Sequence, residues 1–310
     1  MKFLLQSGYK VLLVTIDEEK GKSQKVADYI FLQDFCTKNG VDIYISERYS
    51  LKSSKDIEFF KEKKFQLGFV VGWQRLIPGE ILDSFSVGVF GMHGSSMNLP
   101  KGRGRSPMNW SIIEDRKVFY TNIFKYKSGA DDGDVLDTFK FQITNVDTGE
   151  TMHFKNTLAM KYLILKNIDN LVKENFLLKE QPEATPTYYP KRVEADSLID
   201  WEDDIFNIER LIRAVTKPFN GAYSYIKNNK VIIYRASIFD FQDFGFGDSK
   251  PGEIVEVYDN GKFLVKAYGG LLLVHEFESE IKIANGDLLC THEEVKKVFD
   301  FNKYGFHDLE

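Results

Sequence analysis

Three positive charges stand within five residues in the first half of the chain. The segment Lys101–Arg105 reads Lys-Gly-Arg-Gly-Arg. Guanidinium groups bind phosphate oxygens in pairs, so this segment is compact enough to hold one phosphate or a pyrophosphate and too short to cover a nucleic-acid duplex. His93 precedes it and the acidic segment Asp131–Asp134 follows it. A lone histidine at the end of a strand is more often packed or exposed than catalytic, so the order of the neighbouring motifs has to decide its role.

The overall charge argues against a protein whose main partner is nucleic acid. The 310 residues carry a net charge of -5, whereas such binding needs lysine and arginine opposite phosphates. The apolar runs fall short of the ~20 residues that a spanning helix needs, and Met1–Leu13 is followed by no small-residue cleavage site. We therefore expect a cytoplasmic protein with no membrane partner. Cys36 and Cys290 lack the spacing of a metal site, which predicts two reduced structural thiols and no metal.

Strands alternate with helices in the first half, which predicts a βαβ arrangement and a mostly parallel sheet. The strands are expected at residues 11–16, 42–45, 67–71, 87–92 and 119–125. The helices are expected at 20–38, 54–63 and 107–113, and from Asn156 onward. Inward positions of the first two helices are Ala27, Ile30, Phe31 and Phe35, then Ile57, Phe59 and Phe60. Leu158, Tyr162, Leu165 and Val172 share one face of the last helix, which we expect to pack on the sheet.

The second half reads as a separate all-β unit with one helix. Three prolines between residues 181 and 191 indicate an extended linker. A helix at 205–215 precedes short strands at 222–226, 230–236, 254–257, 263–267 and 271–277. This pattern is typical of a small β-barrel, and we expect one like the oligonucleotide-binding (OB) type. We expect a catalytic domain at 1–180, a linker at 181–193 and an OB-like domain at 194–310. The aromatic-rich segment Phe239–Phe246 fits a hydrophobic hairpin or a substrate wall.

Several motifs occur in an order that resembles the 10-formyltetrahydrofolate-dependent formyltransferases, which include methionyl-tRNA, glycinamide ribonucleotide and sugar-nucleotide formyltransferases. The motifs are Val71-Gly72-Trp73-Gln74-Arg75-Leu76-Ile77-Pro78, Met92-His93-Gly94-Ser95, Leu99-Pro100-Lys101-Gly102-Arg103-Gly104-Arg105-Ser106-Pro107 with Trp110, and Asp131-Asp132-Gly133-Asp134-Val135. Ile199-Asp200-Trp201 and Ile212-Arg213-Ala214, with Pro218, Phe219, Gly221 and Ala222, are similar to the C-terminal domain of methionyl-tRNA formyltransferases. The resemblance covers most of the chain.

The resemblance implies an α/β fold, in which a Rossmann-like formyltransferase domain with a mostly parallel sheet is followed by the small β-barrel. It implies transfer of a formyl group from 10-formyltetrahydrofolate, a cosubstrate, to an amine. His93 would polarise the formyl oxygen or shuttle the amine proton, and Asp131 would orient the imidazole. The residues that the resemblance places beside the folate are Trp73, Gln74, Arg75, Leu76, Gly129, Ala130 and Asp131.

The sequence departs from the family pattern at two places. Family members carry an asparagine two residues before the histidine, where this chain has Gly91, so an amide hydrogen-bond donor is missing. Asn98 and Asn109 are the amides that could replace it and complete the catalytic set. Met1–Gly8 resembles the end of the helix that follows the family's first strand, so we expect that strand to be missing.

The acceptor of the formyl group is predicted from charge. A tRNA enzyme needs a basic channel near its C-terminal domain, yet acidic runs occur at Glu202–Asp204 and Glu276–Glu280. We expect a nucleotide-linked amino sugar, with its pyrophosphate bound by Lys101, Arg103 and Arg105. The alternatives are a methionyl-tRNA formyltransferase and, from another class, a non-catalytic folate- or nucleotide-binding homologue. A homodimer is a further expectation, since such assemblies are common.

Overall fold

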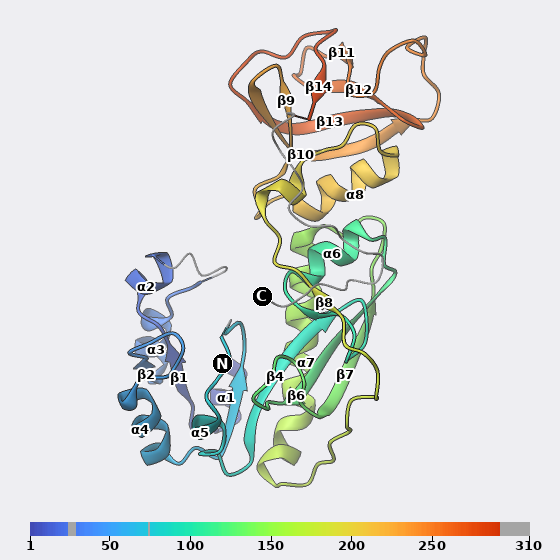
Figure 1. Ribbon diagram of the computed structural model, residues 1–310. Helices are drawn as coiled ribbons and strands as arrows, with labels where there is room; N and C mark the ends of the chain where they lie inside the picture. Colours follow the sequence, from blue (N-terminus) through green and yellow to red (C-terminus); the bar gives the residue numbers. More distant parts are fainter. Residues whose placement is uncertain (24–28, 74, 292–310) are drawn as a thin grey trace. The chain divides into compact units, whose positions relative to one another are not determined.

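The computed structural model describes residues 1–23, 29–73 and 75–291 (Figure 1). Its contacts separate two compact units. Unit 1 combines Met1–Met92, Phe124–Asp134 and Ile168–Lys179, and unit 2 combines His93–Ile123, Val135–Asn167 and the chain from Glu180 onward. Each unit is described by itself. The domain bounds expected from the sequence, 1–180, 181–193 and 194–310, stay a prediction.

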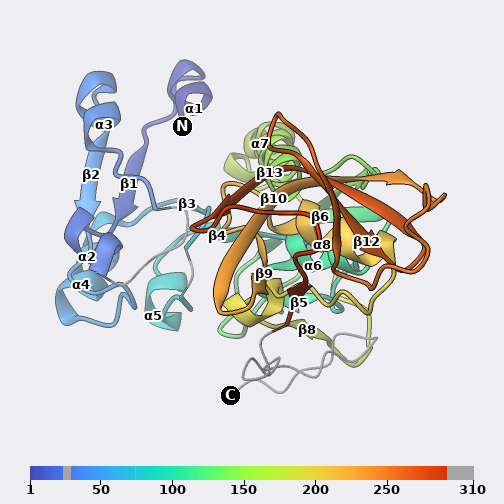
Figure 2. The same ribbon diagram turned by 90° about the horizontal axis from the view of Figure 1, so that it is seen from above.

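Strands and helices alternate in the first half of the chain. The elements are α1 (Lys2–Gln6), β1 (Leu12–Thr15), α2 (Glu18–Ser23), α3 (Gln33–Asn39), β2 (Asp42–Ile45), α4 (Ser54–Lys63), β3 (Leu67–Val70), α5 (Gly79–Leu82), β4 (Gly88–Ser95), β5 (Arg103–Gly104), α6 (Pro107–Ile113), β6 (Val118–Lys125), β7 (Val135–Gln142) and α7 (Gly149–Val172). β1 pairs with β2 in parallel, as Figure 2 shows, and β3 pairs with β4 in parallel. A four-stranded sheet has the order β3-β4-β6-β7. The α/β class with a Rossmann-like parallel sheet is therefore confirmed.

The helix expected over residues 20–38 is wrong as a single element. α2 ends at Ser23, and Tyr29–Leu32 are not helical before α3 begins at Gln33. The ring of Tyr29 lies so close to Gly21 that a Cβ there would be 2.5 Å from it, and the Tyr29 hydroxyl donates a hydrogen bond to the Ile16 carbonyl at 2.8 Å. These contacts place Tyr29 against Gly21 and Ile16, which a continuous helix over residues 20–38 would not allow. Ile30, expected to face inward, is 70% exposed, and Ala27 lies outside the described residues.

α4 forms as its pattern predicts. Ser53 caps its first turn by accepting a hydrogen bond from the Asp56 amide. Phe60 is buried with Leu51 and Ile81, and Ile57 and Phe59 pack against this cluster. The inward face expected for residues 54–63 is confirmed.

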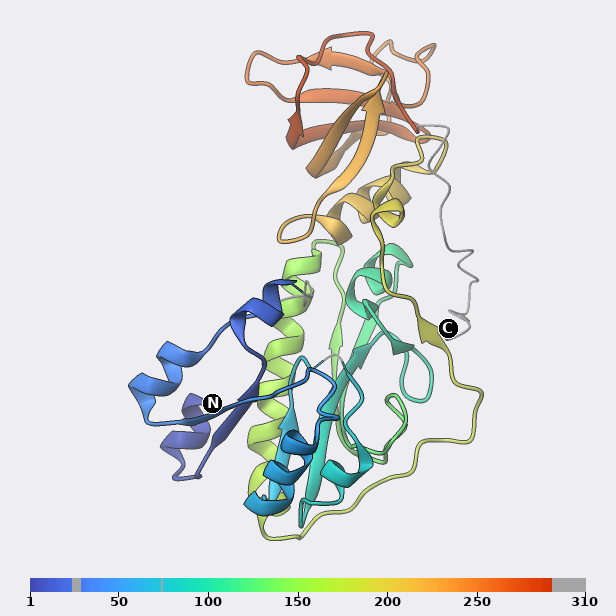
Figure 3. The same cartoon turned by 60° about the vertical axis from the view of Figure 1, so that its left-hand side comes forward.

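The face of α7 expected to pack on the sheet is wrong. Leu158, Tyr162 and Leu165 are 65%, 49% and 43% exposed. The buried face consists of Met152, Ala159, Leu163, Ile164, Ile168 and Leu171. The helix also begins earlier than Asn156, because Thr148 and Thr151 cap its first turn reciprocally. This long helix (Figure 3) is apolar on two faces, so helical periodicity alone could not decide which face would be covered.

The rest of unit 2 is a curled antiparallel sheet with one helix. The remaining elements are β8 (Tyr188–Tyr189), the 3-10 helix η1 (Glu194–Ser197), α8 (Ile205–Val215), β9 (Ala222–Ile226), β10 (Asn229–Asp240), β11 (Ile254–Val257), β12 (Phe263–Ala267), β13 (Gly270–Ser279) and β14 (Leu289–Cys290). The strand order is β11-β12-β13-β10-β9-β14, and an isolated bridge joins Glu253 next to β11 with Leu288 next to β14. The expected OB type stays a prediction.

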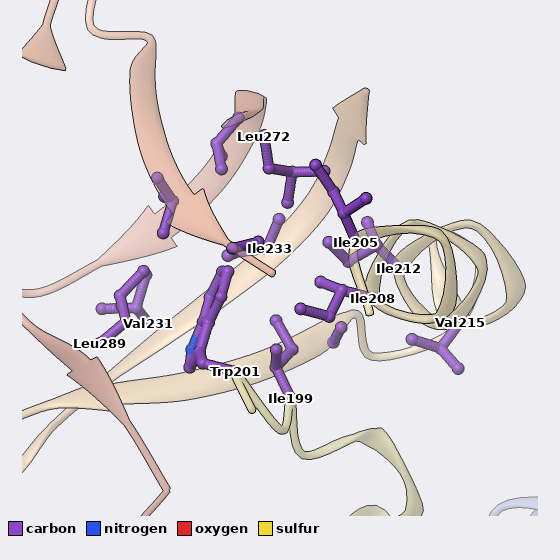
Figure 4. Packing of buried hydrophobic residues seen from close by; sticks show 14 of the residues in the cluster. Ile199, Trp201, Ile205, Ile208, Ile212, Val215, Val231, Ile233, Leu272 and Leu289 are labelled. Atoms are coloured by element: carbon purple, nitrogen blue, oxygen red, sulfur yellow. The ribbon is translucent and has the colours of Figure 1, made fainter. Parts of the chain in front are cut away.

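A shared hydrophobic core holds α8 against this sheet. Ile205, Ile208 and Ile212 project from α8 toward Trp201 and Ile233 (Figure 4), all of them buried. Their spacing of three and four residues is that of one helical face. Trp201 satisfies its only polar atom by donating Nε1–H to the Ser224 hydroxyl at 2.9 Å, so it anchors the core rather than a ligand.

The aromatic-rich segment Phe239–Phe246 lies mostly on the surface of unit 2. Phe241 and Phe244 are 62% and 61% exposed, while Phe246 packs on a small cluster around Leu264. The ring of Phe241 also contacts Phe206 of α8, with 5.7 Å between centroids. Both readings of this segment stay open.

The carboxylate of Asp56 provides a test of the unit 1 fold. It is fully buried and accepts hydrogen bonds from the Tyr44 and Ser53 hydroxyls and from the Glu47 and Arg48 amides at 2.7–3.1 Å. Burial opposes the charged form, but these four donors outweigh it and lower the pKa of Asp56. Because the folded pKa is depressed, this stabilisation exists above the unfolded pKa and is lost as the pH falls through the folded pKa.

We predict that Asp56→Asn lowers the free energy of unfolding by about 2 kcal/mol at pH 7 and that this difference shrinks toward pH 3. Urea unfolding of both proteins at pH 7, 5 and 3 measures it. Asp83→Asn, at an exposed carboxylate of the same unit, is the control and should change little. A difference that does not depend on pH would contradict the role assigned to the Asp56 charge.

Candidate active site

His93 lies on β4 and belongs to unit 2. Its side chain is 8% exposed. Since a carbonyl can only accept, Nε2–H of the imidazole donates to the Gly102 carbonyl, at 2.7 Å. This bond makes Nε2 the protonated ring nitrogen and ties the histidine to the loop that follows β4.

The loop around Gly102 depends on the absence of a side chain there. Gly102 has a φ of +69°, and a Cβ at this position would lie 2.1 Å from the Ser95 Oγ. Its amide donates to the Thr187 hydroxyl at 2.8 Å. The Arg103 amide, which belongs to the same peptide group as the Gly102 carbonyl, donates to the Thr187 carbonyl at 2.9 Å, so this carbonyl presents a fixed acceptor to His93.

The predicted cations Lys101, Arg103 and Arg105 lie on and around β5, which pairs in parallel with β8 of the proline-rich segment. The Arg103 and Arg105 amides donate to the Thr187 and Tyr189 carbonyls at 2.9 and 2.8 Å. Lys101 and Arg105 have exposed side chains, and Arg103 is half-buried. The Arg103 Nη2 donates to the Gln181 side chain at 2.6 Å, and its Nε is buried without a partner among the described residues. The hydrogen bond from His93 to Gly102 therefore joins the imidazole to the residue that directly precedes this short basic strand.

Asn98 and Asn109, the two candidates for the amide missing at position 91, each form a hydrogen bond with another part of the backbone. Asn98 is exposed, and its Oδ1 accepts from the Leu99 amide at 3.1 Å. Asn109 is 5% exposed and donates its Nδ2–H to the Ala214 carbonyl at 2.7 Å. That bond ties α6 to the end of α8, which is a structural task. The catalytic role of either amide stays a prediction.

Asp131 lies in the tight loop between β6 and β7 and belongs to unit 1. The Lys125 amide donates to the Asp134 carbonyl at 3.0 Å, and the Lys127 ammonium pairs with the Asp134 carboxylate at 2.8 Å. A Cβ at Gly133 would meet the Lys125 carbonyl oxygen at 1.7 Å. Asp131 itself has a φ of +52°. Asp134 therefore closes the loop that carries Asp131.

Besides the Ser46 Oγ, two buried polar atoms of unit 1 have no partner among the described residues. They are the Trp73 Nε1, a donor, and the Asp132 Oδ1, an acceptor. Trp73 packs edge-on against Tyr49, with 4.8 Å between centroids, and the Arg75 guanidinium lies 5.0 Å from the same ring. Buried polar atoms without partners are costly and point to a ligand or a water.

The other residues expected beside the folate lie in the same unit. Leu76 is 57% exposed. Gly129 and Ala130 belong to the Asp131 loop, and a Cβ at Gly129 would lie 2.1 Å from the Asp132 Oδ2. Gln74 lies outside the described residues. Unit 1 thus brings together Trp73 and Arg75 around Tyr49, and the glycine loop around Asp132.

Sequence reasoning missed three positions. Nothing in the sequence pointed to Tyr49, which joins Trp73 and Arg75, or to Thr187, which holds Gly102 from far along the chain. Tyr126 was also missed, although it is the first residue after β6 and its ring fills the space beside Gly91. Such contacts between distant segments leave no mark on local periodicity. His93 and Asp131 fall in different units, and their shared role stays a prediction.

Two features are absent from the described residues, which omit 24–28, 74 and 292–310. No helix there is long and apolar enough to span a membrane. No group of three or more histidine, cysteine, aspartate or glutamate side chains is placed to hold a metal ion.

Comparison with known families gives two matches. Residues 6–165 match the family described as "Formyl transferase", and residues 192–290 match "Formyl transferase, C-terminal domain". The first match covers more than half of the chain.

Two relatives are similar in sequence. The bifunctional polymyxin resistance protein ArnA of Wigglesworthia glossinidia brevipalpis is 28% identical over 252 residues, which are 81% of this chain and 37% of that protein. The methionyl-tRNA formyltransferase of Ruminiclostridium cellulolyticum is 27% identical over 283 residues, which are 90% of this chain and 87% of that protein. The chain thus spans just over a third of the first relative and most of the second.

Solved structures share the fold. HypX from Aquifex aeolicus in complex with tetrahydrofolic acid has a TM-score of 0.61 at 17% identity, covering 88% of this chain and 44% of that one. WlaRD, a sugar 3N-formyl transferase crystallised in the presence of dTDP and 5-N-formyl-THF, has a TM-score of 0.60 at 17% identity, covering 91% and 93%. At these identities the likeness shows the fold alone.

The support of His93 by the Gly102 carbonyl can be tested by a matched pair of variants. Gly102 and Gly40 both have a positive φ, but a Cβ at Gly40 has nothing within 4 Å. We predict that Gly40→Ala costs about 1 kcal/mol, from backbone strain, and that Gly102→Ala costs about 3 kcal/mol because overpacking against Ser95 is added. Urea unfolding measures both, and equal costs would contradict the close packing of this loop.

Proposed function

Since this chain belongs to the formyl transferase family and is a formyltransferase, we propose that it moves a formyl group from 10-formyltetrahydrofolate to the amine of a nucleotide-linked amino sugar. The observation that carries the proposal is the hydrogen bond from His93 to Gly102. It joins an imidazole suited to proton transfer to a strand that carries Arg103 and is flanked by Lys101 and Arg105. An acceptor with an amine at one end and a pyrophosphate at the other suits this pairing.

Two buried atoms of unit 1 that lack hydrogen-bond partners, in Trp73 and Asp132, fit the pterin of the formyl donor. A pterin ring is flat and carries both N–H donors and a carbonyl acceptor. The Trp73 indole N–H and the Asp132 Oδ1 are a buried donor and a buried acceptor that lack partners among the described residues, and the exposed Leu76 side chain adds apolar surface. The similar structures solved in complex with tetrahydrofolic acid and in the presence of 5-N-formyl-THF support the same cosubstrate.

The reaction requires three tasks of this chain. The acceptor amine must lose a proton as its nitrogen attacks the formyl carbon, and an imidazole can take it. His93 keeps a proton on Nε2 toward Gly102, and we assign the exchange of the amine proton to its Nδ1. A carboxylate can stabilise the imidazolium that forms, the task we assign to Asp131, and the developing charge on the formyl oxygen needs a hydrogen-bond donor.

Two alternatives remain. The relative from Ruminiclostridium cellulolyticum aligns with this chain over 87% of its own length. This match favours a methionyl-tRNA formyltransferase. The net charge of -5 opposes it. A non-catalytic folate- or nucleotide-binding homologue would bind tetrahydrofolate without turnover. The cytoplasmic location and the homodimer stay predictions.

The proposed function predicts formyl transfer by the purified protein. Wild type is incubated with 10-formyltetrahydrofolate and a panel of nucleotide-linked 3-amino and 4-amino sugars, and product is followed by mass spectrometry. We expect turnover with one sugar and its loss, by a factor of ~10² or more, in His93→Ala. Turnover only with aminoacylated initiator tRNA would favour the first alternative. Folate binding without any product would favour the second.

Arg103 and Arg105 give a prediction about the acceptor alone. We expect the double variant Arg103→Gln/Arg105→Gln to raise the KM of the sugar nucleotide at least ~10-fold, since charge-assisted bonds to phosphate contribute about 1.5–3 kcal/mol each. The KM of the folate should stay within about twofold. Steady-state kinetics with each substrate varied measures both, with Lys117→Gln as control because Lys117 is an exposed cation paired to Asp115. Equal increases in both KM values would contradict the pyrophosphate assignment.

A further inference from the structure

The strand that carries His93 has no side chain at position 91. An ideal Cβ built on Gly91 would lie 1.7 Å from the Tyr126 Cε1, 2.3 Å from its Cζ and 2.6 Å from its hydroxyl oxygen. Real atoms do not approach so closely, so the phenol ring occupies the volume that a side chain at position 91 would need. Gly91 and Tyr126 belong to the same compact unit.

The distance from the Cβ position of residue 91 to the Tyr126 hydroxyl is close to that from an asparagine Cβ to its own amide nitrogen. Bonds of 1.52 and 1.33 Å place the amide nitrogen of an asparagine roughly 2.4 Å from its Cβ. The Tyr126 hydroxyl oxygen stands 2.6 Å from the Cβ position of residue 91. A phenol from another segment therefore puts a polar atom at the same distance from Cβ as an amide at position 91 would.

The backbone holds Tyr126 at this place. Its amide donates to the Val89 carbonyl at 2.8 Å, and its ring stacks on Phe124 with 5.4 Å between centroids. The neighbouring Lys125 amide closes the Asp131 loop by donating to the Asp134 carbonyl. Tyr126 is therefore attached to β4 through its own amide, and to the Asp131 loop through the neighbouring Lys125.

Position 91 faces the same side of the strand as the histidine. β4 runs from Gly88 to Ser95, and residues two apart on a strand project from one face. Gly91 and His93 therefore occupy successive positions on one face of β4.

The Tyr126 hydroxyl is available as a donor. No side-chain hydrogen bond of Tyr126 occurs among the described residues. Burial, and then the nearby charge of Asp131, raise the pKa of Tyr126 well above its usual value. The phenol keeps its proton at neutral pH and can donate a hydrogen bond to an oxygen that gains negative charge.

We propose that the Tyr126 hydroxyl is the hydrogen-bond donor to the formyl oxygen in this active site, in the space left by Gly91. This inference rests on the proposed function. As the acceptor nitrogen bonds to the formyl carbon, the electron pair of the carbonyl π bond moves to oxygen, and Tyr126 stabilises that oxygen without giving up its proton. When the carbonyl re-forms, the bond from the formyl carbon to the folate nitrogen breaks, and that nitrogen takes the proton that His93 removed from the amine.

Tyr126→Phe tests the inference with the ring kept in place. We expect kcat to fall ~10²-fold, the usual cost of one oxyanion donor, while both KM values and the melting temperature stay close to wild type. Tyr120→Phe is the matched control, since Tyr120 is a partly buried tyrosine of β6, and it should leave kcat unchanged. A structural role for Tyr126 would instead lower the melting temperature and leave kcat of the folded enzyme unchanged.

A second pair of variants tests whether a hydrogen-bond donor at position 91 can replace the one at position 126. Tyr126→Ala removes the ring and the donor, and Gly91→Asn added to it supplies an amide in the vacated space. We expect the double variant to recover at least ~10-fold of the kcat that Tyr126→Ala loses, whereas Gly91→Asn alone should destabilise the protein by overpacking.

The outcomes separate this inference from the proposed function. Active wild type with Tyr126→Phe at undiminished kcat overturns the role of Tyr126 alone. Wild type that transfers no formyl group to any acceptor overturns the proposed function, and the inference with it. Loss of kcat in Tyr126→Phe with recovery in the double variant supports both.

Discussion

The hydrogen bond between His93 and the Gly102 carbonyl is the constraint on which the unit 2 site depends. It requires a peptide whose carbonyl is presented in one direction, and Gly102 can supply it because its φ is positive and Ser95 leaves no room for a Cβ. Thr187 holds the same peptide group from the other side, since its carbonyl accepts from the Arg103 amide. A change in any of these groups would therefore move the acceptor of the imidazole, although none of them has chemistry of its own.

Close packing of another segment against a glycine recurs at the places that we assign to acceptor binding and to formyl transfer. At Gly104 a Cβ would lie 2.4 Å from the Tyr189 carbonyl oxygen, which lets β5 and β8 pair. At Gly91 the neighbouring ring is that of Tyr126, and at Gly133 the neighbour is the Lys125 carbonyl. Each glycine allows another segment to take a position that a side chain would fill, so the polar groups around it can come from distant parts of the sequence.

The proline-rich segment shows how a tertiary contact changes the meaning of a sequence pattern. Prolines and the lack of apolar periodicity indicate an extended chain, and residues 188–189 are extended. They are also paired with β5, and Tyr189 is 2% exposed. Its hydroxyl donates to the Glu114 carboxylate, and the Pro190 carbonyl accepts from the Trp110 indole. In unit 2 this segment holds the basic strand and α6 in addition to connecting elements.

The sequence by itself determined the local elements and the order of the motifs. β2, α4, α6, α8, β9, β11 and β12 have the bounds that their periodicity and turn residues predict, because these signals act within a few residues. The positions of His93, the basic segment and the Asp131 loop were also evident from residue type and order. Only the tertiary structure decided which face of α7 is buried, that Tyr29 packs against Gly21, and which group fills the space beside Gly91. Those outcomes depend on contacts between residues far apart in the chain, such as Tyr126 with Gly91 and Thr187 with Gly102, and local sequence carries no record of them.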